Sequence, residues 1–126
     1  LCDSVPDKDA TTLSPRQTFY GPLPRTAREM LEHMRGVNGY YFGQIGVATD
    51  EAGTLETLRA RAFRQLEQES GDYLQNRVFV SGDGEEWTLA KVCRRFVWHD
   101  RIHAKAMFRM ASKLPGAQGL DNRFFF

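Results

Sequence analysis

The sequence lacks the features that mark membrane-bound, secreted and nucleic-acid-binding proteins. None of its 126 residues belong to an apolar run long enough to span a bilayer, and no signal-peptide pattern is present. A formal net charge of only +1 gives no reason to expect nucleic acid or a membrane surface as a partner. An apolar content of 41% is typical of a single globular domain. The chain begins with Leu1 rather than Met, so we expect it to be a processed or excised piece of a longer protein.

Cysteine is scarce. Cys2 lies at the chain end and Cys93 lies inside a helical pattern, so a bridge between them is disfavoured. We expect two reduced thiols, as in a cytoplasmic protein. Cys93 is interpreted as a small core residue, although its place six residues before His99 leaves a ligand role open.

Histidine is scarce too, and the three that exist are placed informatively. At about 100° per residue, His99 and His103 lie in the middle of an apolar helical stripe, one turn apart, where both imidazoles can point at one ion. The rest of that stripe is Leu89, Val92, Phe96, Met107 and Met110. His33 flanks the apolar stripe of an earlier helix. We therefore expect all three histidines to face one core.

Three helices are predicted. The first begins with a capping box, Thr26 to Glu29, and should run to about Val47. Its apolar stripe is Met30, Met34, Val37, Tyr41 and Ile45, and four glycines share a neighbouring face: Gly36, Gly39, Gly43 and Gly46. Two explanations stay open for these glycines. Either a backbone or a ligand approaches that face closely, or the helix ends early, near Gly39 or Gly43.

The second helix should begin after the N-cap Thr54 and close at Gly71, and the third should begin after Thr88 and end near Ser112. Between them, residues 77–80 predict one extended segment leading into a turn, without a convincing second strand. Residues 1–24 are proline-rich and aperiodic, which predicts an extended lead-in. Phe124 to Phe126 would be an exposed apolar patch unless they dock on the domain or bury in a partner subunit.

Three neutral imidazoles are suitable ligands for zinc, nickel, copper or iron, and they leave coordination positions open. Such an ion can activate water or hold a substrate thiol as its anion. Asp100 stands where zinc proteases have Glu, which argues against a peptidase and favours a carboxylate that orients a ligand. Glu29 is either a further ligand or the capping partner of Thr26, and capping is the stronger interpretation. The alternative for each histidine is a core residue hydrogen-bonded to a neighbour.

Four stretches resemble the DinB/YfiT-like metalloenzyme superfamily: Arg25-Thr-Ala-Arg-Glu-Met-Leu-Glu-His33, the continuation Asn-Gly-Tyr-Tyr-Phe-Gly, Glu86-Trp-Thr-Leu-Ala-Lys-Val, and Phe-Val-Trp-His99-Asp-Arg-Ile-His103. The resemblance covers roughly residues 25–112. It implies a four-helix bundle with a divalent-metal site at His33, His99 and His103, often a homodimer, and members that are thiol-dependent transferases and isomerases. One departure is clear, because the family's first helix would fall before residue 25, where no helical pattern exists. Three explanations stay open: that helix is missing with the N-terminus, the lead-in replaces it, or a partner chain supplies it.

We therefore predict an all-α, DinB-like up-and-down bundle over residues 25–114, preceded by the lead-in 1–24 and followed by a tail, 115–126. The predicted function is a metal-dependent enzyme, a thiol S-transferase or a hydrolase, that uses zinc or nickel at His33, His99 and His103. Asp100, Tyr40 and Tyr41 are expected beside the ion or in the substrate pocket. The expected partners are a small-molecule substrate, such as a low-molecular-weight thiol, and a second copy of the chain. The competing hypothesis is a non-catalytic helical interaction module with a structural metal or core histidines.

Overall fold

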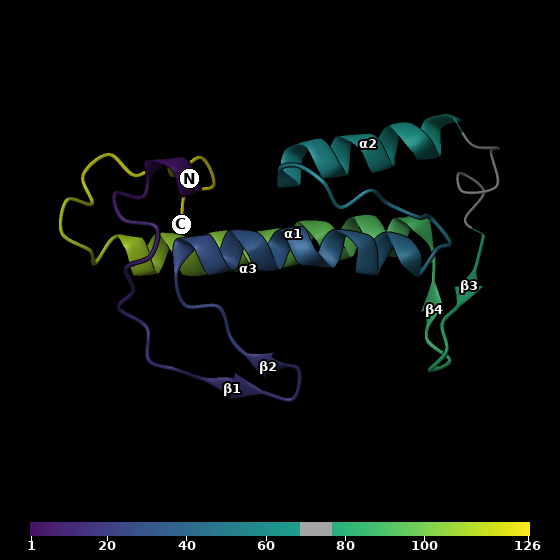
Figure 1. The fold of residues 1–126 in the computed structure, drawn as a ribbon, viewed down its shortest axis with the longest axis horizontal. Coiled ribbons are helices and arrows are strands. Elements are labelled where there is room, and N and C mark those ends of the chain that lie inside the picture. The colour runs from purple at the N-terminus through teal and green to yellow at the C-terminus, as the bar shows by residue number, and fades with distance from the viewer. Residues whose placement is uncertain (69–76) are drawn as a thin grey trace. The chain divides into compact units, whose positions relative to one another are not determined.

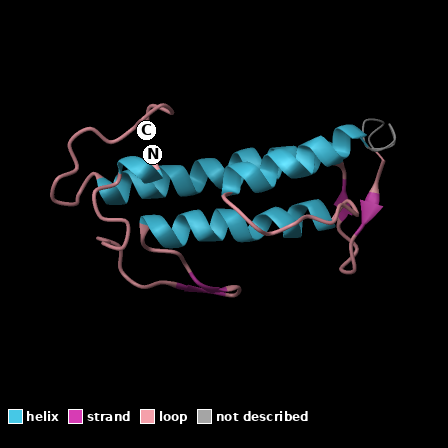
Figure 2. Cartoon of the chain, turned by 45° about the horizontal axis from the view of Figure 1, so that its top comes forward, coloured by secondary structure: helices cyan, strands magenta, loops and turns pink. Residues whose placement is uncertain are grey.

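The computed structural model describes residues 1–68 and 77–126, which are mostly helical with two small antiparallel sheets (Figures 1 and 2). The helices are α1 (Ala27–Gly43), α2 (Leu55–Gln68) and α3 (Leu89–Ala111), and a 3₁₀ turn, η1, covers Cys2–Ser4. The strands are β1 (Gln17–Thr18), β2 (Gly21–Pro22), β3 (Phe79–Val80) and β4 (Glu86–Trp87). The three expected helices are present. None of the helices in the described ranges has the length and apolarity that crossing a membrane requires.

The chain divides into two compact units, which are described separately. The first comprises Leu1–His33 with Asp100–Phe126, and the second is Met34–His99. Both α1 and α3 contribute residues to each unit.

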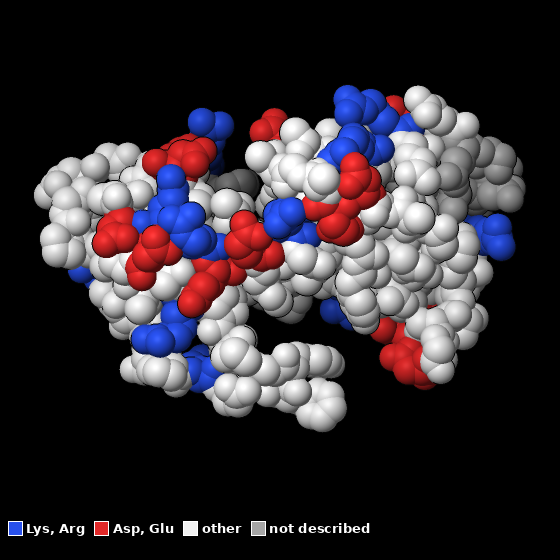
Figure 3. All heavy atoms as spheres, in the orientation of Figure 1, with Lys and Arg blue, Asp and Glu red and all other residues white. Residues whose placement is uncertain are grey.

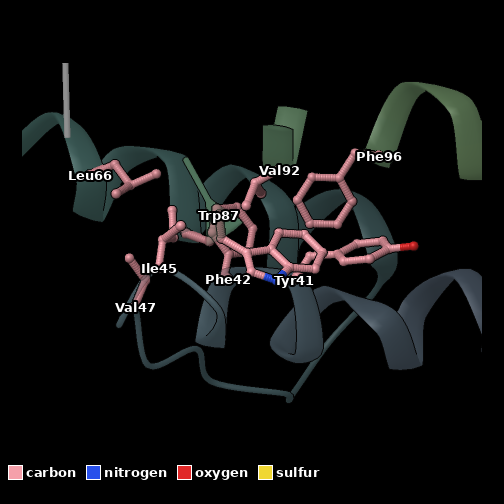
Figure 4. Packing of buried hydrophobic residues seen from close by; sticks show 9 residues of the cluster. Tyr41, Phe42, Ile45, Val47, Leu66, Trp87, Val92 and Phe96 are labelled. Carbon is pink, nitrogen blue, oxygen red and sulfur yellow. The ribbon is translucent and has the colours of Figure 1, made fainter. Parts of the chain in front are cut away.

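The core of the second unit forms where the apolar faces of its helical segments meet. Phe42 is fully buried, and its ring lies 5.4 Å from that of Phe63 on α2 and 5.1 Å from that of Phe96 on α3. Figure 4 shows this cluster, with the Tyr41 hydroxyl pointing away from it. Its buried members are Tyr41, Phe42, Ile45, Val47, Ala62, Leu66, Trp87, Val92 and Phe96. The stripes predicted for the first and third helices supply Tyr41, Ile45, Val92 and Phe96 to this core, whereas Phe42, Val47 and Trp87 belong to neither stripe.

A β-hairpin precedes α3, where only one extended segment was predicted. Phe79 pairs with Trp87 and Val80 with Glu86 across the turn. The prediction was wrong because a two-residue strand is too short to show alternation in the sequence. The paired residue Trp87 is buried, with 2% of its surface exposed. The N-cap predicted at Thr88 is confirmed, since its hydroxyl accepts a hydrogen bond from Lys91 N at 3.1 Å.

Helix α1 ends at Gly43, four residues before the expected end at Val47, which is the early stop that its glycines left open. Gly46 follows in the left-handed region, with φ of 76°. Val47 N donates to Phe42 O at 3.1 Å and Gly46 N donates to Gly43 O at 3.0 Å, which is the hydrogen-bond pattern of a Schellman cap. The chain turns at Gly46 and returns along α1, where Glu51 and Thr49 lie against Gly39.

This geometry predicts opposite effects for two glycine-to-alanine substitutions. Gly46→Ala should destabilise the fold by about 1 kcal/mol, because an L side chain is strained at a positive φ. Gly36→Ala should stabilise it by about 0.5–1 kcal/mol, since Gly36 is inside α1 and a Cβ there meets no atom of the described structure within 4 Å. Urea unfolding of both variants measures the two signs. Equal effects would contradict the early end of α1.

In the first unit the two chain ends pack together, as the N and C labels in Figure 1 indicate. The amino group of Leu1 lies 3.6 Å from Asp121 Oδ2, and Asp121 N donates to Ser4 Oγ at 2.9 Å. Phe126 docks on α3, with its ring 6.3 Å from that of Phe108. Docking, one of the two outcomes expected for the three phenylalanines, is therefore seen for Phe126 alone, because Phe124 and Phe125 stay 57% and 93% exposed.

The lead-in is more ordered than its aperiodic sequence indicates. It contains η1 and the hairpin β1–β2, whose tip carries Phe19 and Tyr20 at 96% and 95% exposure. Hydrogen bonds tie the remainder to α1 and its N-terminus, including Thr11 Oγ1 to Arg25 O at 2.6 Å. On the face drawn in Figure 3, basic and acidic side chains are interspersed rather than gathered by sign.

Candidate metal centre

Helix α3 presents His99 and His103 one turn apart, as the spacing predicted. His99 is buried, with 6% of its surface exposed, and His103 is half-buried. They lie among the apolar residues that the stripe predicted, between Phe96 and Met107, which are 4% and 1% exposed. The basic side chains of α3 are on its outer side, where Arg94, Arg101 and Arg109 are exposed.

Helix α1 supplies the third histidine. The ring of His33 lies 4.7 Å from the ring of His103, centroid to centroid, with the planes at 69°. His33 itself is exposed, so the expectation that all three histidines face a core was wrong for this residue. It sits at the flank of the α1 stripe, whose centre is taken by the buried Met30 and Met34.

The structure brings the three histidines together. One ring nitrogen from each of His33, His99 and His103 lies within 4.8 Å of the others. Two nitrogens bound to one zinc at about 2.1 Å can be at most about 4.2 Å apart. Ring nitrogens that lie within 4.8 Å of one another are therefore close to the spacing that a single ion requires. Three neutral imidazoles also match the donor type that zinc and nickel accept, so the residues fit a divalent transition metal.

Tyr41 connects the buried His99 to the aromatic core. The Tyr41 ring lies 6.0 Å from the His99 ring at 83°, and 5.2 Å from the Phe96 ring. Tyr40, the other tyrosine expected at the site, is 57% exposed and its ring lies beside Tyr41 and Trp87. The structure thus places Tyr41 rather than Tyr40 against His99. Asp100 follows His99 on α3 and is half-buried, and its ligand-orienting role stays a prediction.

The two other candidate ligands do not join the histidines. Cys2 and Cys93 are both free thiols, as expected, and neither belongs to the cluster among the described residues. Burial raises the pKa of the Cys93 thiol, which disfavours the thiolate that a metal would need. Glu29 instead closes the predicted capping box: its Oε2 accepts from Thr26 N at 3.2 Å and Arg25 N at 2.7 Å, while Glu29 N donates to Thr26 Oγ1 at 3.1 Å.

Glu29 therefore carries a pH-dependent part of the stability. The two backbone N–H groups hold the pKa of Glu29 below its usual value. Its contribution is present above the ordinary Glu pKa of about 4.3 and is lost as the pH falls through the lower, folded-state value. Glu29→Gln should cost no more than about 0.5–1 kcal/mol at pH 7, since an exposed carboxylate is screened by solvent. Urea titrations should show this difference shrinking towards pH 3, and a difference that grew there would contradict the capping role.

Two cavities of the first unit lie beside the histidines, and sequence reasoning did not find them. One of about 650 Å³ is lined by His33, Glu32 and Glu29. The other, of about 400 Å³, is lined by His103 and Ile102. The lead-in contributes Arg16, Leu23 and Pro24 to both, and Arg25, which follows it, also lines both. The prolines of this segment signalled an extended chain, but no sequence pattern showed which helices it covers.

No family model, no curated protein and no solved structure matches this chain.

Proposed function

We propose that the chain is a DinB-like metal-binding helical domain in which His33, His99 and His103 hold one divalent ion, zinc or nickel. The observation that carries the proposal is the convergence of three histidines, the only ones in the sequence, within 4.8 Å of one another. They come from positions 66 residues apart, between His33 and His99, on two different helices. Histidines kept only for packing have no reason to meet in this way.

The access of small molecules to the three histidines favours a catalytic metal centre over a purely structural one. A structural zinc site is normally closed by four protein ligands, whereas a catalytic one keeps a position for water or substrate. Here the described residues offer three ligands, and His33 is exposed. The cavities that adjoin His33 and His103 give a small molecule a place next to those ligands.

The bound ion would stabilise a thiolate or hydroxide, which attacks a small electrophile in a thiol transfer or a hydrolysis. The protein's own residues bind and orient. His99 is buried and packs against Tyr41, which in turn packs against Phe96, so one ligand is positioned before the others close. Asp100, on the same helix, is the candidate for orienting a histidine through its second ring nitrogen.

The first test is the metal content of the purified, untagged protein, measured by elemental mass spectrometry after incubation with zinc or nickel. We expect about one equivalent per chain, and none in a variant with all three histidines replaced by alanine. The loaded protein is then assayed with low-molecular-weight thiols and a chromogenic electrophile. Absence of metal from the wild-type protein would overturn the proposal. Stoichiometric metal without turnover would restrict it to a metal-binding domain.

A non-catalytic interaction module is the second candidate, because the structure exposes aromatic rings that are costly in water. Phe19 and Tyr20 pack edge to face, with centroids 5.3 Å apart, while both remain almost fully exposed. Analytical ultracentrifugation of the wild type and a Phe19→Ser, Tyr20→Ser variant tests this interaction role, which an enzyme could also have. A dimer that dissociates in the variant would support an interaction role for the hairpin tip, including the homodimer that the DinB resemblance implies.

A further inference from the structure

The smaller of the two cavities has the composition of a ligand pocket. Its volume of about 400 Å³ falls within the range of roughly 300–1,000 Å³ that small-molecule pockets occupy. It lies entirely in the first unit, and most of its wall is apolar: Leu13, Leu23 and Pro24 from the lead-in, Met30 from α1, and Ile102 and Ala106 from α3. Such a wall favours an apolar ligand body over water.

The charges in this wall are all of one sign. Arg16 and Arg25 line the cavity, and no acidic side chain of the described residues does. The larger neighbouring cavity contains the same two arginines, but there Glu29 and Glu32 balance them. The smaller cavity is thus the one in which an anion finds net positive charge beside an apolar surface.

The two arginines differ in the hydrogen bonds and charged neighbours that their guanidinium groups already have. The Arg25 side chain is fixed, since its Nε and Nη2 donate to Leu13 O at 3.0 and 2.8 Å. Its positive charge also helps to lower the pKa of Glu29. Arg16 has no carboxylate partner within the parts of the chain that the structure describes. Its backbone is held independently, because Leu23 N donates to Arg16 O at 3.0 Å. Arg16 therefore offers an uncommitted guanidinium on an anchored segment.

We propose that this cavity binds a small carboxylate with an apolar body, and that the Arg16 guanidinium holds the carboxylate. A guanidinium presents parallel N–H donors that match the two oxygens of a carboxylate. The apolar body then lies along Leu23, Met30 and Ile102. Because His103 forms part of the same wall, a bound ligand reaches one of the three clustered histidines. That such carboxylates are the substrates of the metal centre rests on the proposed function, whereas their binding does not.

Three probes separate the contribution of the carboxylate from that of the apolar body. The first, 4-phenylbutyrate, carries both the charge and the body. The second, 4-phenylbutanamide, has the body without the charge, and acetate has the charge without the body. Titration calorimetry is run on the untagged full chain after chelator treatment, so that a metal ion cannot hold the carboxylate. We expect 4-phenylbutyrate to bind about 10-fold or more tightly than either partial probe, because a charge-assisted hydrogen bond and apolar burial each contribute. Equal affinity for acid and amide, or no measurable binding of the acid, would overturn the proposal.

Arg16→Gln is the decisive variant, with Arg109→Gln as its matched control. Arg109 is an exposed arginine of the same unit that lines neither cavity. Arg16→Gln should lose about 10-fold in affinity for 4-phenylbutyrate and leave the amide unchanged, whereas Arg109→Gln should match the wild type with both probes. Circular dichroism verifies folding, which the retained Arg16 backbone bond favours. An unchanged preference for the acid in Arg16→Gln would contradict the assignment.

Failure of this proposal and failure of the proposed function give different results. Arg16-dependent binding by a protein that takes up no zinc would leave the carboxylate pocket standing and remove the metal centre. If zinc uptake requires the histidines but binding of 4-phenylbutyrate does not depend on Arg16, the metal centre would stand and the carboxylate pocket would be removed.

Discussion

Replacing His99 with alanine is expected to lower zinc affinity by more than about 100-fold, because even residues that only support a ligand are worth about 10–100-fold. Of the three histidines, His99 is the most buried, and its ring is fixed against Tyr41. His99 would therefore be the most preorganised of the three proposed ligands. Competition with a chromogenic chelator measures the affinity, and the far-UV circular dichroism should stay helical, since alanine is the best helix former.

The matched control is Arg94→Ala, which alters an exposed residue of the same helix and should leave zinc affinity unchanged. His103→Ala should resemble His99→Ala, since both positions contribute one nitrogen to the cluster. Full zinc occupancy in His99→Ala would show that the histidines are not the ligands. A loss of helical signal would instead show that His99 serves packing. This is the alternative interpretation, in which His99 is a buried core residue.

Much of the fold could be predicted because it rests on local rules. Thr26 with Glu29, Thr54 and Thr88 are hydroxyl N-caps followed by apolar stripes, and each begins a helix in the structure. The pairing of His99 with His103 follows from helical periodicity alone. The C-terminal end predicted for α2, Gly71, lies outside the described residues.

The rest depends on contacts between distant segments, which periodicity does not encode. Nothing in the proline-rich lead-in indicated that Arg16 and Leu23 would line cavities beside His33 and His103. The exposure of His33 likewise depends on what covers its side of α1, not on the spacing within α1 itself. The end of α1 was ambiguous because its four glycines allow either the close approach of another group or an early end of the helix. The cap at Gly46, which is seen only in the structure, shows that the helix ends early.

Phe42→Ala is expected to be the most destabilising of the substitutions considered, at about 3–5 kcal/mol, which is typical of removing a buried phenylalanine. Its ring is fully buried between Phe63 and Phe96, so three helices lose contacts at once. Thermal unfolding should show a midpoint lower by at least about 10 °C for a domain of this size.

Phe19→Ala provides the control for Phe42→Ala, since it removes the same ring from a side chain that is 96% exposed, and it should change stability by no more than about 0.5 kcal/mol. Similar effects of the two substitutions would contradict the packing of α1, α2 and α3 in the second unit. The contrast also bears on the metal centre, because Phe96 contacts both Phe42 and Tyr41, and Tyr41 packs on His99. If zinc protects the wild type against unfolding but protects Phe42→Ala less, the aromatic core is what holds His99 in place for the ion.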